Sequence, residues 1–414
     1  MSKAQQRVSV SNVSRPRVGV AGVGQIPFRT RYPEHTFQEL AFEVARAALR
    51  DAGITKDDVQ SAVYGIYSDL LMRQQSSDSL VHDYLGLRGK PALRISAGAS
   101  TGAFAARAAY AEIASGLADI VLLLGVQKSG DLINPENQHR GEGTMMSESI
   151  THDVNWQHPV TPFPPAAWGL SLNAHMERYG TPTVEQLAKA ALKNHRNARL
   201  NPYAQLKLDL TLEDILHSRI IAWPTTMYEC CGFAECAAAM VLVSERVAGR
   251  MAKRPVWITG VGTSVEAVLQ DGDGEHYGRV PAIRRSREAA YAMAGVTKPL
   301  EQLDVAEVHD IFSGLEIMAY EELGLCAAGE GGRLVDQGVT ERTGPLPVNP
   351  SGGRIACGHI AGVSEIFSLC EVTRQLREEA GERQVAIRRG RGLVSTVGGQ
   401  SANIAAALVL ERDA

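Results

Sequence analysis

The chain lacks any apolar segment that could cross a membrane, because none of its 414 residues belongs to a run of about 18 uncharged apolar residues. Its N-terminal stretch, MSKAQQRVSVSNVSRPR, contains basic residues but no apolar core of signal-peptide length. We therefore expect a cytoplasmic protein with no membrane span.

An excess of one charge is also missing. The 42 Lys and Arg residues face 46 Asp and Glu residues, the formal net charge is -4, and neither sign forms a long run. Proteins that bind nucleic acid or an anionic membrane surface gather basic residues into a patch. The composition therefore argues against nucleic acid and favours a small molecule or another protein as the partner.

The six cysteines include no CxxC pair. They are Cys230, Cys231, Cys236, Cys326, Cys357 and Cys370. Such spacing indicates neither a zinc knuckle nor a disulfide framework. Spacing alone would allow a metal site from His217, Cys231 and Cys236. Buried packing is the better interpretation of these cysteines, and we predict no metal in this chain.

What the sequence does contain is an alternation of short β-branched apolar runs with helical patterns. This alternation is typical of βα units around a parallel or mixed sheet. The length and the hydrophobic content of 44% suffice for two cores. Strands are predicted at 17–21, 62–66, 93–96, 120–124, 392–396 and 404–410, and helices at 37–52 and 101–115.

One supersecondary unit occurs twice. Residues 45–65 read ARAALRDAGITKDDVQSAVYG, and residues 286–310 read SREAAYAMAGVTKPLEQLDVAEVHD. Each copy has an Ala-rich helix, a glycine suited to a left-handed C-terminal cap (Gly53 or Gly295), a Thr-Lys turn and a strand. The repeat predicts two similar halves, residues 1–250 and 251–414.

Residues 127–225 depart from this rhythm. They contain Asn134-Pro135, His158-Pro159, Pro162 and Pro164-Pro165, and amphipathic helical patterns at 168–178 and 184–199. We interpret them as an ordered insertion in the first half that covers or shapes the active site.

Glycines mark three further places. Gly22-Val23-Gly24 suggests a dinucleotide site, but Pro27 and Phe28 stand where a third glycine and a helix should be, so we interpret it as a tight turn. The turns at 97–102 and 358–362 each lead into a long helix. Two helix N-termini brought to one cleft in this way would favour an oxyanion or a phosphate.

Two histidines are the best candidates for chemistry. His309 ends the strand of the second repeat unit, where a side chain faces the crevice of an α/β sheet. The alternative is an imidazole that caps the helix beginning near Ser313. His359 lies within the glycine-rich run SGGRIACGHIAG, whose glycines let the backbone approach a ligand closely. Its alternative role is a hydrogen bond to the turn.

Several motifs together resemble those of the thiolase superfamily. VNPSGGRIACGH at 348–359 is similar to the second-half motif of thiolases, and EVHDIF at 307–312 to the His-Asp-Cys-Phe motif of the sterol-carrier-protein branch. The similarity extends from GVGQIPF near the N-terminus to GLVSTVGGQSAN near the C-terminus, and so covers essentially the whole chain.

The resemblance implies the α/β class, with a five-layered αβαβα thiolase fold of two similar halves and a loop insertion. It also implies a homodimeric core and a coenzyme A thioester substrate. In the family pattern, His359 polarises the thioester carbonyl or moves a proton, and His309 occupies an oxyanion-hole position. On this basis the residues expected to contact the substrate are Ala99, Ser100, Gly358, Gly398 and Gly399.

Departures from the family pattern are equally informative. The family's nucleophilic cysteine precedes the central helix in a Cys-Ala-Ser-Gly stretch, and the matching position here is Ala99, whose methyl group forms no thioester. Ile311 replaces a second family cysteine, and Ile360 replaces the proline after the histidine. A relocated nucleophile, at Cys357, Cys230 or Ser100, stays open as an alternative to ordinary packing.

Thiolase-like proteins without the nucleophile include aldolases that cleave β-hydroxyacyl-CoA, notably in the degradation of steroid side chains. They often act with a small partner that combines a zinc ribbon and an OB-fold. A retro-aldol step needs a base and an oxyanion site but no acyl-enzyme. The candidate bases are His309, His359, Tyr228 and Tyr291, although both tyrosines have packing as an alternative role.

We therefore expect an enzyme, an acyl-CoA carbon–carbon lyase. The alternatives are a thiolase or Claisen-type acyltransferase acting on a β-ketoacyl-CoA, and a non-catalytic acyl-CoA-binding subunit of a complex.

Overall fold

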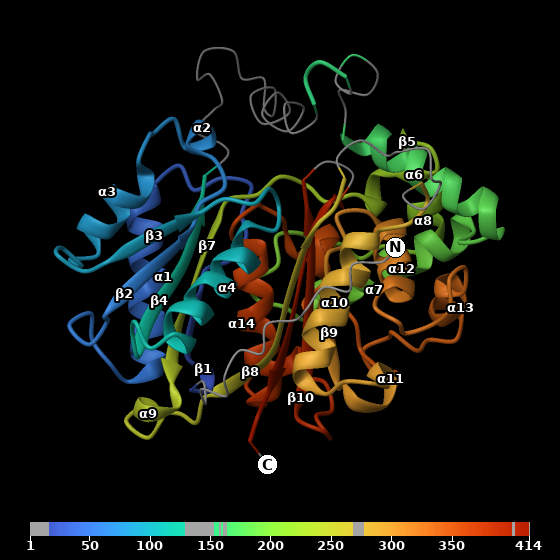
Figure 1. Cartoon of the computed structure of the whole chain (residues 1–414). Coiled ribbons are helices and arrows are strands. Elements are labelled where there is room, and N and C mark those ends of the chain that lie inside the picture. Colours follow the sequence, from blue (N-terminus) through green and yellow to red (C-terminus); the bar gives the residue numbers. More distant parts are fainter. Residues whose placement is uncertain are drawn as a thin grey trace, which may run out of the picture.

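The computed structural model describes residues 16–128, 153–156, 159, 164–267, 277–399 and 402–413 (Figure 1). Within the predicted insertion, Asn134-Pro135, His158 and Pro162 lie outside the described residues. The blue elements of the N-terminal half lie at the left of Figure 1, the orange and red elements of the C-terminal half lie at the centre and right, and the green helices of the insertion lie at the upper right.

The N-terminal half contributes five strands in the order β3-β2-β4-β7-β1. They are β1 (Val18–Gln25), β2 (Ser61–Gly65), β3 (Ala92–Ile95), β4 (Ile120–Gln127) and β7 (Cys236–Ser244). Strand β2 is parallel to β3 and β4, whereas β7 is antiparallel to β4 and β1. The helices of this half are α1 (Phe37–Ala52), α2 (Asp69–Met72), α3 (Ser77–Tyr84), α4 (Thr101–Ala114) and α9 (Glu245–Ala248).

The C-terminal half repeats this topology in the order β8-β11-β10-β9. Its strands are β8 (Val256–Val265), β9 (Val305–Val308), β10 (Arg391–Gly398) and β11 (Ile404–Glu411). A parallel bridge between Ala306 and Val348 stands where the first half has its edge strand. The helices are α10 (Pro281–Ala294), α11 (Pro299–Gln302), α12 (Ser313–Glu322), α13 (Gly331–Asp336) and α14 (Ser364–Leu376).

The two sets of strands meet at β1 and β8. These strands pair at Gly19–Trp257 and Val20–Val256, so the nine strands form one hydrogen-bonded series. Helices α4 and α14 pack against each other, and α14 contacts β1 and β7 of the first half as well as β9 and β10 of the second. The outer faces are covered by α1 and by α10. This succession confirms the expected five-layered αβαβα fold.

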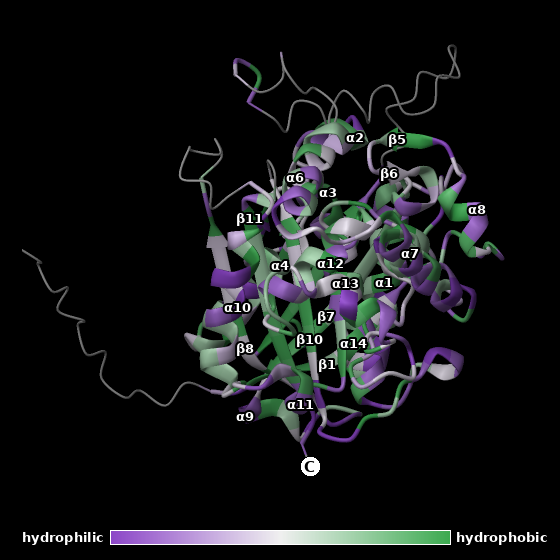
Figure 2. Ribbon diagram, turned by 90° about the vertical axis from the view of Figure 1, so that its right-hand side faces the viewer, coloured by the Kyte–Doolittle hydropathy of each residue, from purple (hydrophilic) through white to green (hydrophobic). Residues whose placement is uncertain are grey.

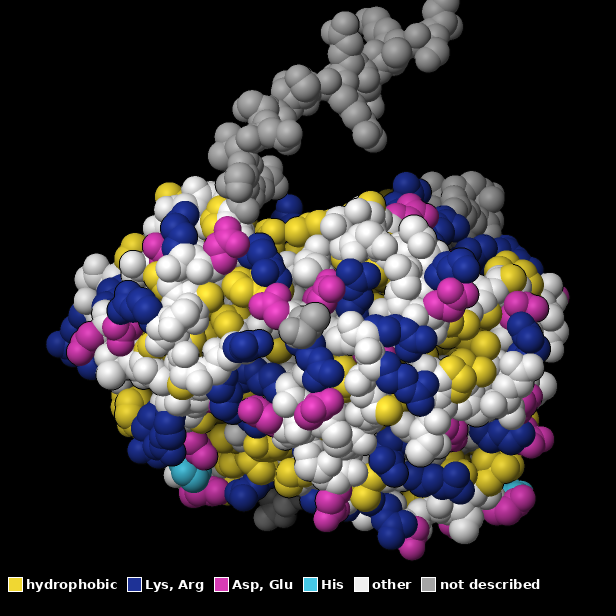
Figure 3. Space-filling model, turned by 90° about the horizontal axis from the view of Figure 1, so that it is seen from below, with side chains coloured by type: hydrophobic (Ala, Val, Ile, Leu, Met, Phe, Trp, Pro, Cys, Tyr) yellow, Lys and Arg dark blue, Asp and Glu magenta, His cyan; other side chains and the backbone are white. Residues whose placement is uncertain are grey.

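Hydrophobic strands fill the interior, as the green ribbons of β1, β7 and β10 show in Figure 2. Both basic and acidic side chains are scattered over the face seen in Figure 3. The predicted division near residue 250 falls between α9 and β8.

Local sequence signals explain both helices of the repeat. Helix α1 begins at a capping box in which Thr36 and Glu39 bond each other's backbone N–H, and it ends at Gly53 with φ 75°. Helix α10 has Pro281 at its start and Gly295, with φ 67°, at its end. The left-handed caps predicted from the sequence are confirmed.

The interpretation of Gly22-Val23-Gly24 as a tight turn is wrong, because these residues lie inside β1. A Cβ on Gly22 would lie 2.2 Å from the carbonyl oxygen of Ala48, and one on Gly24 would lie 2.1 Å from that of Val44. Both glycines therefore allow α1 to pack directly on the strand.

The insertion contains α6 (Pro164–Tyr179), α7 (Val184–Arg199), α8 (Leu212–Leu216), β5 (Ile220–Ala222) and β6 (Thr225–Thr226). Its two longer helices confirm the predicted helical patterns. In the described part of the chain, no helix combines the length and the apolar character needed to cross a membrane.

Candidate active site

A cavity of about 90 Å³ lies where the two halves and the insertion meet. Five of the eight predicted site residues line it: Ala99, His309, His359, Gly398 and Gly399. The other lining residues are Tyr67, Gly98, Pro164, Ala167, Trp168, Ile311, Ala361, Val397 and Ala402.

His309 follows β9 directly and is only 2% exposed. Its neighbour Asp310 holds the turn, because its carboxylate accepts hydrogen bonds from the backbone N–H of Arg354 (2.6 Å) and from Nδ2 of Asn194 (2.8 Å). Neither ring nitrogen of His309 has a partner among the described residues. Three influences hold the pKa of His309 well below its usual value. They are, in order of size, burial of the ring, the positive charge of Arg354 and the neighbouring imidazole of His359. A neutral imidazole therefore faces the cavity with unsatisfied nitrogens.

His359 comes shortly before α14. Its ring lies edge-on to that of His309, with the ring centroids 5.2 Å apart. Burial and the charge of Arg354 lower the pKa of His359 to about 3, so its ring is also neutral near pH 7.

Ser364 sets the orientation of His359. The Ser364 hydroxyl accepts from the backbone N–H of Ile360 (2.8 Å) and donates to the carbonyl of Ile360 (2.9 Å). Its contact with Nδ1 of His359 (3.2 Å) then requires Nδ1 to be the donor. This arrangement leaves Nε2 unprotonated, with its lone pair free to accept a proton or a hydrogen bond.

The N-termini of α4 and α14 converge as predicted, and a carboxyl group of the protein bridges them. Glu365, in the first turn of α14, is fully buried. Its Oε2 accepts from the backbone N–H of Gly362 (3.1 Å) and from that of Gly102 (3.4 Å), which lies in the first turn of α4. Burial raises the pKa of Glu365 to about 7 against the opposing influence of Arg354 and these N–H groups. The positive ends of both helices are thus shared with an internal acid.

Glycines hold the wall formed by Ala99 close to the end of β10. A Cβ on Gly398 would lie 2.5 Å from the backbone nitrogen of Ser100 and 2.6 Å from that of Ala99. A Cβ on Gly98, which has φ 55°, would lie 2.6 Å from the backbone nitrogen of Gly399. The two backbone segments can meet only because side chains are absent here.

Three predicted site residues do not line the cavity. Ser100 is fully buried, and its hydroxyl lies 3.2 Å from that of Thr396. Gly358, with φ 137°, packs against Phe28, whose ring carbon would lie 2.5 Å from an added Cβ. The ring of Tyr228 stands edge-on to that of His195 at 6.1 Å.

Tyr291, the remaining candidate base, is not among the residues that line the cavity. It belongs to α10 and donates to the carbonyl of Leu323 (3.3 Å), and burial raises its pKa. This geometry fits the packing alternative.

Neither candidate replacement thiol lines the cavity, and Cys357 is buried whereas Cys230 is half-buried. The Sγ of Cys357 accepts from Nδ2 of Asn201 (3.4 Å), and burial raises the thiol pKa well above its usual value. The Sγ of Cys230 lies 3.3 Å from the carbonyl oxygen of Thr226, and burial raises its pKa to about 12. Neither thiol is activated as a thiolate nucleophile. Within the described ranges, no group of three or more His, Cys, Asp or Glu side chains could hold a metal ion.

Sequence reasoning missed Tyr67, Trp168 and Glu365. Tyr67 lies two residues beyond the end of β2, near the place that His309 takes directly after β9, so comparison of the two repeat units could have found it. Trp168 lies on α6, with its ring 6.3 Å from that of Phe312. The insertion thus contributes directly to the cavity wall.

Solved structures with a similar fold define the fold class. The Ltp2-ChsH2(DUF35) aldolase aligns with 96% of this chain and 98% of its own, with a TM-score of 0.78 and 22% identity. Human mitochondrial 3-ketoacyl-CoA thiolase aligns with 96% and 98%, with a TM-score of 0.70 and 19% identity. The chain has the thiolase fold.

Sequence similarity identifies the family. Residues 19–210 match the thiolase N-terminal domain, and residues 271–412 match the thiolase C-terminal domain-like family. The acetyl-CoA acetyltransferase of Methanothermobacter thermautotrophicus is 33% identical over 89% of this chain and 93% of its own. Sterol carrier protein 2 of Bos taurus is 34% identical over 90% of this chain and 68% of its own. The chain belongs to the thiolase superfamily and is of the sterol-carrier-protein 2 type, an enzyme of thiolase-like acyl-CoA chemistry.

Proposed function

We propose that this protein is a carbon–carbon lyase that cleaves a β-hydroxyacyl-CoA by a retro-aldol reaction, with a steroid or other lipid side chain as the candidate acyl group. The observation that carries the proposal is the presence of Ala99 in the same cavity lining as two neutral histidines. The cavity offers groups for proton transfer and oxyanion stabilisation without a nucleophile at this position.

The reaction can be written through these two side chains. His359 accepts the proton of the β-hydroxyl group at Nε2, and the Cα–Cβ bond breaks as the hydroxyl-bearing carbon becomes a ketone or an aldehyde. The electron pair of that bond passes to the thioester as an enolate, whose oxygen accepts a hydrogen bond from an N–H of His309. Return of the proton from His359 to Cα yields the shortened acyl-CoA. Coenzyme A enters as part of the substrate.

The burial and raised pKa of both candidate thiols weigh against the acyltransferase alternative. The acetyltransferase name of one relative supports that alternative. A non-catalytic acyl-CoA-binding subunit is the second rival, and one relative, BbsB of Thauera aromatica, is named as a thiolase subunit.

Two assembly features complete the proposal. A homodimer is expected from the family resemblance, and a zinc-containing OB-fold partner is expected from the aldolase resemblance. The aldolase structure with the same fold is named Ltp2-ChsH2(DUF35) aldolase, and this double name supports a partner for this chain.

The test is a mass-spectrometric screen of the purified protein against β-hydroxyacyl-CoA and β-ketoacyl-CoA esters, with and without an OB-fold partner. A carbonyl product together with a shortened acyl-CoA, formed without free coenzyme A and without a covalent acyl-enzyme, is the expected result. Turnover of β-ketoacyl-CoA with free coenzyme A, together with an acyl adduct lost on Cys357→Ala, Cys230→Ala or Ser100→Ala, would establish the acyltransferase instead. Binding without turnover under every condition would establish the subunit role.

A further inference from the structure

A second cavity lies on the outer face of the N-terminal half. Its volume is about 470 Å³, within the range of pockets that hold small organic ligands. It is bounded by α1, the segment 53–56 that follows it, residues 85–87 after α3, and Leu122 of β4. None of the described residues lines both this cavity and the candidate active site.

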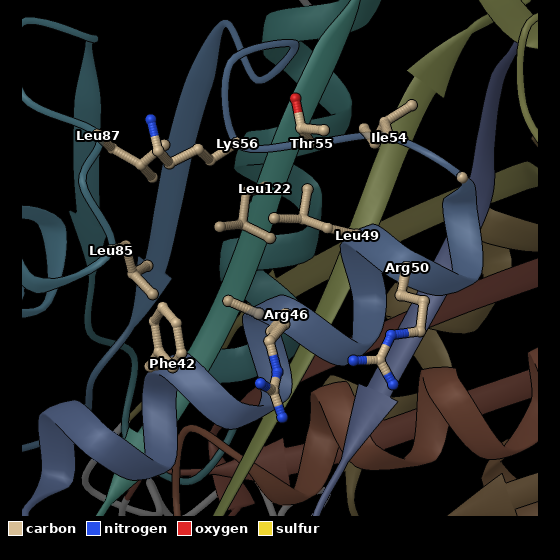
Figure 4. A pocket seen from close by; sticks show the side chains of 12 residues that line it. Phe42, Arg46, Leu49, Arg50, Ile54, Thr55, Lys56, Leu85, Leu87 and Leu122 are labelled. Carbon is tan, nitrogen blue, oxygen red and sulfur yellow. The ribbon is translucent and has the colours of Figure 1, made fainter.

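The interior of this outer pocket is aliphatic. Figure 4 shows Leu122 among the surrounding side chains of Leu49, Leu85 and Leu87. Leu87 and Leu122 are each 1% exposed and form the floor, whereas Phe42 at the rim is 42% exposed. Phe42 packs edge-on against Tyr84, with ring centroids 6.0 Å apart. The pocket therefore has a buried aliphatic floor and an aromatic rim.

The charged groups at its edge all have the same sign. Arg46 and Arg50 lie one turn apart on α1, are exposed, and have no ion-pair partner among the described residues. Nearby cations are paired, since Lys56 lies 2.7 Å from Asp57 and Arg88 forms an ion pair with Asp83. No Asp or Glu appears among the described lining residues. Two free guanidinium groups thus border an aliphatic pocket.

We propose that the outer pocket binds an amphipathic anion with an aliphatic body, such as a fatty carboxylate. The hydrocarbon chain fills the leucine-lined interior, where apolar burial drives binding. The anionic head lies at the rim, where Arg46 and Arg50 supply charge-assisted hydrogen bonds. The volume suits a chain of about ten carbons. This site is separate from the acyl-CoA cavity and does not depend on the proposed lyase activity.

A fatty carboxylate and a lipid phosphate monoester both combine an aliphatic chain with an anionic head. The binding experiment therefore uses probes that distinguish these two head groups. Isothermal titration of the full chain with decanoate, decyl phosphate and decanol compares two heads with a neutral one on the same body. We expect saturable one-site binding of the anions. Tighter binding of decanoate identifies a carboxylate as the preferred head, and tighter binding of decyl phosphate identifies a phosphate.

The rim is tested by the double variant Arg46→Glu/Arg50→Glu. It should weaken binding of both anions about tenfold, because two exposed attractive charges become repulsive, while leaving decanol unchanged. The matched control is Arg196→Glu/Arg388→Glu, which makes the same change of charge at two exposed arginines elsewhere. This control should leave the affinity for all three probes unchanged.

The interior is tested by Leu49→Trp, which should fill the half-buried side of the pocket and abolish binding of all three probes. Its thermal unfolding temperature reports whether the fold is intact, and the arginine variants keep the test independent of that result. Absence of saturable binding, or anion affinities unaffected by Arg46→Glu/Arg50→Glu, overturns the proposal. A change of oligomeric state in that variant, without ligand binding by the native chain, would instead assign this face to a protein contact.

Discussion

At the scale of single residues, the candidate active site is defined by Ala99, which provides no nucleophile, and by His309 and His359, whose imidazole rings can exchange protons and hydrogen bonds. A methyl group cannot carry an acyl intermediate, so the proposed reaction depends on proton transfer and on stabilisation of an enolate oxygen. Arg354 acts on both histidines, because its buried charge, together with burial, lowers the pKa values of His309 and His359 and keeps both rings neutral. Neutral imidazoles can accept a proton or donate an N–H, and these are the two properties that a retro-aldol step uses.

Replacement of His359 by alanine should reduce carbon–carbon cleavage about a hundredfold or more while weakening binding of the CoA ester only slightly. The reason is that proton transfer occurs in the transition state rather than in the bound substrate. Steady-state kinetics and direct titration measure the two effects separately. His217→Ala, at an exposed histidine directly after α8, is the control. Equal losses of affinity and turnover would show that His359 serves substrate binding instead.

Glu365 should make the folded protein less stable as the pH rises from about 4.5 to about 7. Its folded pKa, raised by burial to about 7, exceeds the usual value of 4.5, so the folded state binds the proton more tightly than the unfolded state does. Glu365→Gln removes this titration while keeping a hydrogen-bond acceptor. The variant should match the native chain near pH 4 and exceed its free energy of unfolding by up to about 3 kcal/mol at pH 8.

Chemical denaturation at the two pH values measures this difference. Glu382→Gln, at an exposed glutamate, is the control for loss of a negative charge. An identical pH dependence in Glu365→Gln and the native chain would contradict the assignment of the titration to Glu365.

At the scale of elements, the sequence predicted features that depend on local residues. The caps of α1 and α10, the insertion helices and the position of His309 after β9 follow from short patterns of glycine, proline and apolar residues. The prediction for Gly22 and Gly24 was wrong, because glycine is needed at these positions for α1 to pack closely on β1. That packing is a contact between two segments, which a local sequence pattern does not reveal. Glu365 was missed for the same kind of reason, since only the folded chain brings it to the backbone N–H of Gly102. Tyr67 differs, because comparison of the two repeat units could have predicted its place beside the cavity.

The approach of β10 to the start of α4 predicts that Gly398→Ala is damaging. A methyl group there would lie 2.5 Å from the backbone nitrogen of Ser100, and relief requires the strand end and the Ala99 wall to separate. We expect a loss of about 1 to 3 kcal/mol in stability and a larger fractional loss of cleavage than of CoA-ester binding. Calorimetry and kinetics measure these effects. Gly249→Ala, where an added Cβ meets nothing within 4 Å, should change neither. A fully active Gly398→Ala would show that this contact does not set the cavity geometry.

At the scale of the whole molecule, the two halves pack against each other through a common hydrophobic core. Helix α14 packs against β1 and β7, and a single hydrophobic cluster includes Val20 and Leu122 of the first half with Ile366 and Leu408 of the second. We expect one cooperative unfolding transition in scanning calorimetry, and no stable fold for residues 1–250 expressed alone, because that fragment would expose the surface covered by α14. Two resolved transitions, or a folded fragment, would show that the halves are independent domains.

The free edge of the nine-stranded series predicts how whole molecules associate. Strand β3 ends the series, and Ala92 and Leu93 are exposed on it, Leu93 by 42%. An exposed apolar edge strand with unpaired backbone groups is a template for pairing with another chain, and a twofold axis would let two copies of β3 pair with each other. We therefore expect a homodimer by light scattering at micromolar concentration.

Leu93→Lys should weaken the dimer at least about tenfold, since a charged group would be buried at the contact. Leu117→Lys, at a leucine that is 82% exposed outside the strands, should leave the dimer intact. Sedimentation equilibrium of the three proteins gives the dissociation constants, and a native chain that stays monomeric, or a Leu93→Lys variant as dimeric as the native chain, would exclude β3 as the contact.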